Sequence, residues 1–377
     1  MSYDQQRQAA TEALVRMLKR NSGKGIRQII GSVETFDYRN PIESLALASD
    51  AMRAVSGFAE IGTFDTTDKW YGGIYASSGV VLGIPYNSSE VLRFIPQTRG
   101  ISTFGNFGTG TAKFTGGVLL PDGNVLCVPR NAAQIGIIYP SSRTTMFVGP
   151  SWGGGVDKFV GAVLTPAGKV WMIPFDFPSA VEVNPSSQNY DSFQYGNLGA
   201  GGNKWVGGVL AGNGKIYCIP FNATQILEID PITKELTLFG DLQGTAKWAG
   251  GALAPNGKIY AAPFNSTQVL EIDPYTRTTR LFGNLAGSSK WCSINAAPNG
   301  RMYCVPRNAI GVLEIDPYSD AIRIIGNRTG DIKWASGVMA DNGKLYGIPR
   351  QATSLCEFSI PSSGPNSWTL SAYVNKL

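Results

Sequence analysis

A lysine followed by an aromatic residue recurs along the chain at almost constant intervals, and this repeat constrains the fold more than any other feature. The seven pairs are Lys69-Trp70, Lys113-Phe114, Lys158-Phe159, Lys204-Trp205, Lys247-Trp248, Lys290-Trp291 and Lys333-Trp334. Successive pairs stand 44, 45, 46, 43, 43 and 43 residues apart. A period of this length is typical of the blades of a β-propeller. The repeats predict two domains, an arm of residues 1–57 and a propeller of residues 58–377.

Each repeat divides into four short apolar segments separated by turn residues. In the fourth copy these segments cover 205–211, 215–220, 226–230 and 235–240. The Asn213-Gly214 pair between the first two segments predicts a two-residue hairpin with a type I′ turn. Pro220 ends the second segment, because proline has no N–H to donate to a sheet. The sequence therefore predicts an all-β fold, a seven-bladed propeller of four-stranded antiparallel blades around a central channel.

Two segments compete for the outermost strand of the last blade. Residues 58–64, FAEIGTF, stand before the first repeat, and residues 367–373, SWTLSAY, follow the seventh. Either segment aligns with the fourth strand of a repeat. The sequence leaves open which one closes the ring.

Residues 1–57 contain no copy of the repeat and predict a short helical arm. Leu14, Met17 and Leu18 lie at helical spacing in a first segment, and Leu45 and Met52 lie in a second segment that begins at Asn40-Pro41. A propeller closes without such an arm. The helices either pack on the sides of the blades or anchor the chain to another protein or a sister subunit.

The repeated lysines and three arginines are the candidate binding residues. Loops between blades and loops between second and third strands share one face of a propeller, so a ring of positive charge is expected there. Its members are Lys69, Lys113, Lys158, Lys204, Lys247, Lys290, Lys333, Arg130, Arg307 and Arg350. The lysines either bind an anion or glycan or hold neighbouring blades together through loop carbonyls. Because the arginines interrupt the repeat, they are the better candidates for specific contacts.

The residue content argues against catalysis. The chain contains no histidine, which is the most common general base and metal ligand. Its five cysteines are not spaced as zinc-binding pairs and are expected to be free, buried thiols. No phosphate-binding or dinucleotide motif occurs. We therefore expect no catalytic residue, no metal and no cofactor, and a chain that is not an enzyme.

Charge and hydropathy bear on location and partners. A net charge of +5 is spread over 377 residues, unlike the clustered positive charge of a nucleic-acid-binding protein. No apolar run has the length of a membrane span, and the first residues do not resemble a secretion signal. We expect neither a membrane nor a specific nucleic acid as partner, and assembly in a cytoplasm.

The repeat pattern Lys-Trp-x-Gly-Gly-x-Leu-Ala-x-Asn-Gly-Lys-Ile-Tyr-x-Ile-Pro resembles the blades of propellers loosely related to the kelch type. It is also similar to repeats in proteins of large viruses, bacteriophage virions and protists. This resemblance covers residues 58–377. It implies a structural or interaction protein, such as a virion component whose arm binds other virion proteins and whose propeller face meets a host protein or glycan. The alternatives are an intracellular kelch-like adaptor, a glycan-binding lectin and a glycan-processing enzyme.

Overall fold

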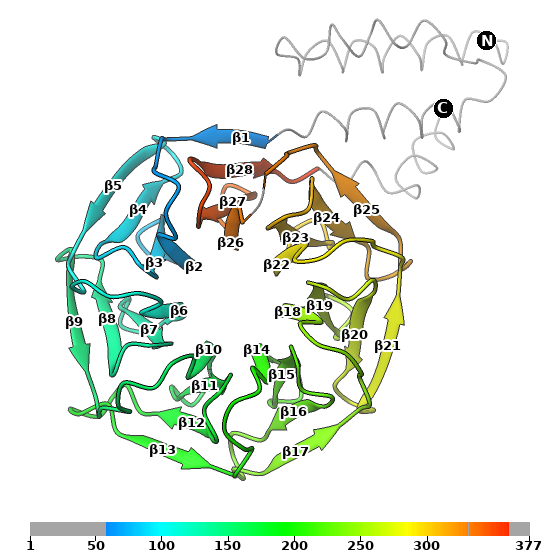
Figure 1. Ribbon diagram of the computed structural model, residues 1–377, viewed down its shortest axis with the longest axis horizontal. Helices are drawn as coiled ribbons and strands as arrows, with labels where there is room; N and C mark the ends of the chain where they lie inside the picture. Colours follow the sequence, from blue (N-terminus) through cyan, green and yellow to red (C-terminus); the bar gives the residue numbers. More distant parts are fainter. Residues whose placement is uncertain (1–57, 331, 362–377) are drawn as a thin grey trace, which may run out of the picture. The chain divides into compact units, whose positions relative to one another are not determined.

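The computed structural model describes residues 58–330 and 332–361 of the chain. These residues form a closed ring of seven four-stranded antiparallel sheets (Figure 1). The predicted all-β propeller and its seven blades are confirmed. The expected N-terminal helices, with Leu14, Met17, Leu18, Leu45 and Met52, lie outside the described residues, as does the segment 367–373.

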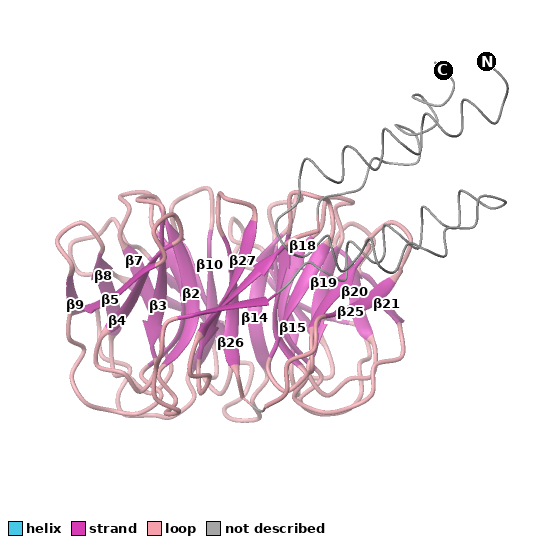
Figure 2. Ribbon diagram, turned by 90° about the horizontal axis from the view of Figure 1, so that it is seen from above, coloured by secondary structure: helices cyan, strands magenta, loops and turns pink. Residues whose placement is uncertain are grey.

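The first six blades use their strands in chain order from the channel outward. The innermost strands run roughly along the channel axis, and the outer strands are turned toward the rim of the ring (Figure 1 and Figure 2). The innermost strands are β2 (Trp70–Ala76), β6 (Phe114–Leu119), β10 (Phe159–Leu164), β14 (Trp205–Leu210), β18 (Trp248–Leu253), β22 (Trp291–Ala296) and β26 (Trp334–Met339). The second strands are β3 (Val80–Pro85), β7 (Val125–Pro129), β11 (Val170–Pro174), β15 (Ile216–Pro220), β19 (Ile259–Pro263), β23 (Met302–Pro306) and β27 (Lys344–Pro349). The third strands are β4 (Val91–Ile95), β8 (Ile135–Tyr139), β12 (Ala180–Val183), β16 (Ile226–Ile229), β20 (Val269–Asp273), β24 (Val312–Ile315) and β28 (Leu355–Ser359). The outer strands of the first six blades are β5 (Gly100–Phe104), β9 (Thr144–Val148), β13 (Ser192–Tyr195), β17 (Leu236–Phe239), β21 (Thr278–Phe282) and β25 (Ile322–Ile325).

The outer strand of the seventh blade comes from the other end of the propeller sequence. Strand β1 (Phe58–Ile61) pairs antiparallel with β28, with Phe58 opposite Phe358 and Ile61 opposite Leu355. Of the two segments that competed for this place, 58–64 therefore supplies the strand. Because β1 leads directly into β2 of the first blade, its pairing with β28 ties the last blade to the first and closes the ring.

The hairpin between the first two strands has a different turn from the one predicted. In the fourth blade the N–H of Gly214 donates to the carbonyl of Ala211 at 3.0 Å, and the N–H of Ala211 donates to the carbonyl of Lys215 at 2.9 Å. Gly214 has a φ of 80°, whereas Asn213 is not among the residues with positive φ. The turn is therefore a type I turn followed by a left-handed glycine, and the type I′ prediction is wrong. Asn213 occupies its position because its side chain donates to the hydroxyl of Tyr217 at 2.9 Å and accepts from the N–H of Lys215 at 3.2 Å.

Glycines on the innermost strands allow neighbouring blades to approach each other at the channel. Gly72 has a φ of 93°, and a Cβ atom there would lie 2.5 Å from the Cα of Gly116. The register of β2 against β3 shifts at this point, between Trp70 and Gly73. Only a residue without a side chain fits a bulge with this φ and this spacing.

The aromatic residue of each repeated pair packs into the apolar layer between blades. Trp248 is 2% exposed and packs with Ile219 of the preceding blade. Its indole N–H donates to the carbonyl of Gln268 at 2.8 Å, which ties the inner strand to the loop between the second and third strands. Within the described part of the chain, no helix has the length and apolar character that a membrane crossing requires.

Candidate ligand-binding site at the channel mouth

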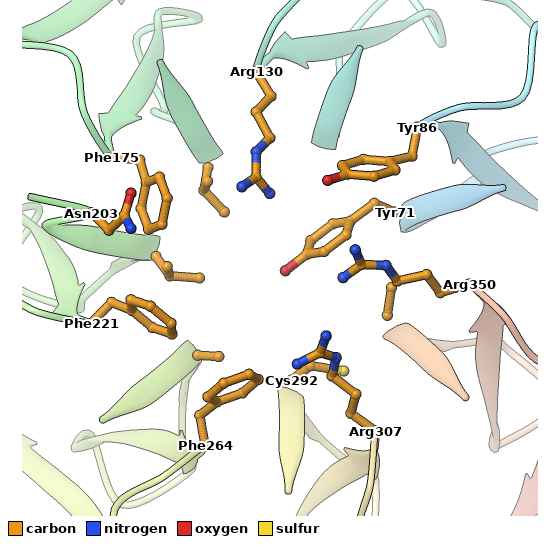
Figure 3. Close-up of a pocket in the computed structure, with 14 residues that line it drawn as sticks. Tyr71, Tyr86, Arg130, Phe175, Asn203, Phe221, Phe264, Cys292, Arg307 and Arg350 are labelled. Carbon is orange, nitrogen blue, oxygen red and sulfur yellow. The ribbon is translucent and has the colours of Figure 1, made fainter. Parts of the chain in front are cut away.

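One end of the channel opens into a cavity of about 270 Å³, which we call the channel mouth. Seven residues surround it, each directly after the proline that ends a second strand, and we call them the mouth ring. They are Tyr86, Arg130, Phe175, Phe221, Phe264, Arg307 and Arg350 (Figure 3). Below them the cavity is lined by the second residue of most innermost strands, namely Tyr71, Val160, Val206, Ala249, Cys292 and Ala335. Equivalent positions of the seven blades thus line the cavity with different side chains.

The repeated lysines hold the main chain of the mouth ring in place. In each blade the N–H of the mouth-ring residue donates to the carbonyl of the lysine that begins the blade, as in Phe221 to Lys204 at 2.9 Å. The carbonyl of the same residue accepts from the N–H of the next lysine, as in Lys247 to Phe221 at 3.0 Å. This pattern recurs in all seven blades and closes on itself between Arg350 and Lys69 at 3.1 Å. The mouth-ring positions are therefore held by backbone bonds, which leave their side chains free to differ.

The seven lysine side chains lie beneath this surface. All are between 3% and 9% exposed, and their ammonium groups donate to loop carbonyls. Lys290, for example, donates to the carbonyls of Phe264, Ser266 and Gly287 at 3.1, 2.9 and 2.9 Å. Burial lowers the pKa of Lys247 and of Lys290 to about 8. This geometry agrees with the interpretation of the lysines as links between loops, and it places no lysine side chain among the residues that line the cavity.

The three arginines line the cavity together, but their charges are not equally balanced. Arg130 forms an ion pair with Asp157, and Arg350 binds Asp68 through two bonds of 3.1 and 2.9 Å. Each of these acids directly precedes a repeated lysine. Arg307 has Ile332 at the corresponding place, and it forms no ion pair within the described residues. Its Nε atom is buried without a hydrogen-bond partner.

The aromatic side of the cavity is formed by three consecutive blades. The rings of Phe175 and Phe221 lie 5.8 Å apart and those of Phe221 and Phe264 lie 5.5 Å apart. They pack on Val160 and Val206 from the innermost strands. This cluster spans three blades and is separate from the larger core clusters between the sheets. We call this group the phenylalanine wall.

Tyr71 and Cys292 add polar atoms on the arginine side. The guanidinium of Arg350 lies 5.3 Å from the centre of the Tyr71 ring, and the Tyr71 hydroxyl points into the cavity (Figure 3). Burial raises the pKa of Tyr71, so this hydroxyl is a hydrogen-bond donor at neutral pH. Burial also raises the pKa of Cys292 to about 12, against the opposing effect of Arg307 and Arg350, so the sulfur remains a thiol.

Sequence reasoning selected the three arginines and missed the rest of the cavity. Phe175, Phe221, Phe264, Tyr71 and Cys292 were not among the candidate binding residues. One sequence feature could have identified the inner lining of the cavity, namely variation at one repeat position. The residue that follows each Lys-aromatic pair is, in chain order, Tyr, Thr, Val, Val, Ala, Cys and Ala. On a strand, the residue next to a buried aromatic points to the opposite side, which here is the channel.

The acidic residues of the third strands form ion-pair clusters away from the cavity. Glu228 is 1% exposed and is bound by Lys215 of its own blade and Arg277 of the next. Burial alone would raise the pKa of Glu228, but bonds from Arg277, Lys215 and Tyr217 outweigh it and lower the pKa to about 2. These carboxylates are therefore charged and structural. Among the described residues, no three His, Cys, Asp or Glu side chains are arranged to hold a metal ion.

Comparison with known proteins supports the fold. No protein-family model matches the sequence, and no curated protein matches it. Among solved structures, the chain is similar to a streptogramin B lyase, with a TM-score of 0.68 and 13% identity over 80% of this chain and 96% of that one. It is also similar to virginiamycin B lyase from Staphylococcus aureus bound to quinupristin, with a TM-score of 0.69 and 12% identity over 81% of this chain and 99% of that one. The extracellular domain of a two-component system from B. thetaiotaomicron has a TM-score of 0.63 and 13% identity, over 81% of this chain and 43% of that one. At these identities the likeness shows a shared fold.

These neighbours correct one prediction made from the sequence. We expected a chain that is not an enzyme, because it contains no histidine, no cysteine pairs spaced for zinc and no phosphate-binding or dinucleotide motif. Streptogramin B lyase is an enzyme on the same propeller fold, so this expectation is contradicted. The physical reason is that function depends on individual side chains at single positions of a fold. A pattern shared by all seven repeats does not reveal such single positions.

Proposed function

We propose that the channel mouth is a binding site for a small molecule that carries an anionic group. The observation that carries this proposal is the guanidinium of Arg307. It lines the cavity without a carboxylate partner among the described residues, while Arg130 and Arg350 each have one. Arg307 is partly buried and its Nε atom has no hydrogen-bond partner, which is costly, and an anion that enters the cavity would lower that cost. Arginine is also suited to two-pronged bonding with a carboxylate or phosphate.

The proposed site rests on residues of this chain, and no reaction is carried over from the similar solved structures. The quinupristin complex was obtained with a catalytically inactive variant of virginiamycin B lyase in which a histidine is replaced by alanine. The present chain contains no histidine, so that residue has no counterpart here. What supports binding is a concave cavity with an apolar wall and a few polar groups, the usual composition of a ligand site.

Thermal-shift screening of a library of small neutral, cationic and anionic compounds tests the proposal. Anionic compounds should raise the melting temperature of the full chain and of Arg143→Met, whose arginine is exposed on a peripheral turn. The same compounds should lose at least tenfold in affinity with Arg307→Met. A screen in which neutral or cationic compounds bind and anions do not would refute the proposed function.

A place in a virion is a separate proposal, which rests on the resemblance of the repeats and on the arm of residues 1–57. In this proposal the arm binds another virion protein, and the propeller face meets a host protein or glycan. Mass spectrometry of purified particles tests it, and absence of the chain from particles would remove it. A glycan array tests host binding, with Arg307→Ala and Arg350→Ala as the variants that should lose it.

A further inference from the structure

The cavity at the channel mouth has two chemically different sides, and the division follows the order of the blades. Blades three, four and five contribute Phe175, Phe221 and Phe264, whereas blades six and seven contribute Arg307 and Arg350. Figure 3 shows the phenylalanine wall on one side of the cavity and these two guanidinium groups, with Tyr71, on the other. A ligand that uses the whole cavity therefore has an apolar part and an anionic part.

We infer that the site takes a one-ring aromatic carboxylate, with the ring on the phenylalanine wall and the carboxylate on Arg307. This inference rests on the proposed function and names the class of its ligand. The cavity of about 270 Å³ lies just below the roughly 300–1,000 Å³ of pockets that hold drug-sized molecules, which favours a single ring.

Phe221 is the ring on which the ligand stacks. Guanidinium groups lie 5.2 Å from the centre of Phe264 and 5.6 Å from that of Phe175, so both ends of the wall face a cation of the protein. Within the described residues no guanidinium group lies over the Phe221 ring, and Phe221 is only partly buried. Its face is thus the open part of the wall. Aromatic rings pair favourably when offset or edge to face, beyond what buried area alone supplies.

The separation between wall and cation limits how far the carboxylate stands from the ring. The Arg307 guanidinium lies 5.2 Å from the centre of the Phe264 ring, which itself lies 5.5 Å from the centre of the Phe221 ring. Since one ring separates Arg307 from Phe221, a ligand that stacks on Phe221 reaches the guanidinium with its carboxylate directly on the ring or one carbon away. Benzoate and phenylacetate meet this requirement, and the Tyr71 hydroxyl is a further donor to the carboxylate.

Isothermal titration calorimetry with the full chain tests the inference. The probes are benzoate, phenylacetate, cyclohexanecarboxylate, acetate and benzamide. Benzoate or phenylacetate should bind several-fold more tightly than cyclohexanecarboxylate and at least tenfold more tightly than acetate or benzamide. Phe221→Leu should remove the preference for an aromatic ring, whereas Phe193→Leu, on an outer strand where Phe193 is 55% exposed, should not. Arg307→Met should weaken the binding of every carboxylate at least tenfold. Arg307→Lys keeps the positive charge but loses the paired N–H donors of the guanidinium, so it should weaken binding less.

The outcomes separate this inference from the proposed function. If acetate or cyclohexanecarboxylate binds as tightly as benzoate and depends on Arg307, the aromatic class is wrong and the anion site stands. If Phe193→Leu changes the preference as much as Phe221→Leu, the stacking role of Phe221 is wrong. If no carboxylate binds and the library screen also yields no anion, both proposals fall.

Discussion

Lys247 donates two hydrogen bonds to the carbonyl oxygen of Phe221, one from its backbone N–H at 3.0 Å and one from its ammonium group at 3.1 Å. Lys290 contacts Phe264 in the same way, at 3.0 and 3.1 Å. The residue that begins one blade therefore positions the mouth-ring residue of the blade before it. A repeated lysine that does not line the cavity thus positions residues that do.

Replacement of Lys247 by methionine should destabilise the propeller. The change removes the bonds of 2.9 Å that the ammonium group donates to the carbonyls of Ala223 and Gly244. A loss of about 1 kcal/mol in the free energy of unfolding is expected from the lost hydrogen bonds. Urea denaturation measures it, and Lys169→Met is the control, because the Lys169 ammonium group forms no hydrogen bond or ion pair in the described structure. Equal stability of the two variants would contradict the positioning role.

The arginines of the mouth ring should differ in their effect on stability. Arg350→Met leaves the partly buried Asp68 without its partner, so we expect a loss of about 1–3 kcal/mol. Arg307→Met removes a cation that has no ion pair among the described residues, so stability should stay the same or rise. Thermal unfolding of both variants without ligand compares them. A larger loss for Arg307→Met would show that this residue is structural.

The glycines at the channel should not tolerate a side chain. Gly72→Ala places a Cβ atom 2.5 Å from the Cα of Gly116, at a residue with a φ of 93°. Backbone cannot move aside as a flexible side chain can, and a left-handed residue adds about 1–2 kcal/mol of strain. A loss of more than about 2 kcal/mol is expected in chemical denaturation. Gly154→Ala is the matched control, since a Cβ atom there meets nothing within 4 Å.

Acid should weaken the propeller through the glutamates of the third strands. Glu228 and Glu271 each have a pKa of about 2 in the fold, lowered from an ordinary value of 4.5. Because the folded-state pKa lies below that of the unfolded chain, the stabilisation is complete above pH 4.5 and is lost as the pH falls toward 2. Denaturation at a series of pH values measures this slope, which Glu228→Gln should reduce. Glu235→Gln, at an exposed residue, should leave the slope unchanged.

The sequence located some parts of the candidate site and missed others for a physical reason. Arg130, Arg307 and Arg350 were found because they stand at a repeat position where the other four copies have an aromatic residue. Their unequal partners were not found, because the pairing depends on whether Asp157, Asp68 or Ile332 lies across the boundary to the next blade. A residue that acts from a neighbouring blade has no fixed signal within its own repeat.

The sequence by itself determined the number of blades, the four strands of each and their turns in outline, because every blade repeats the same local pattern of apolar residues, glycine and proline. Only the tertiary structure decided which end of the chain closes the ring, where β1 pairs with β28. It alone placed Phe221 across the cavity from Arg350 and left Arg307 without an acidic partner among the described residues. Local patterns repeat in every blade, but a site at the axis combines one residue from each blade, and that combination exists only when the ring is closed.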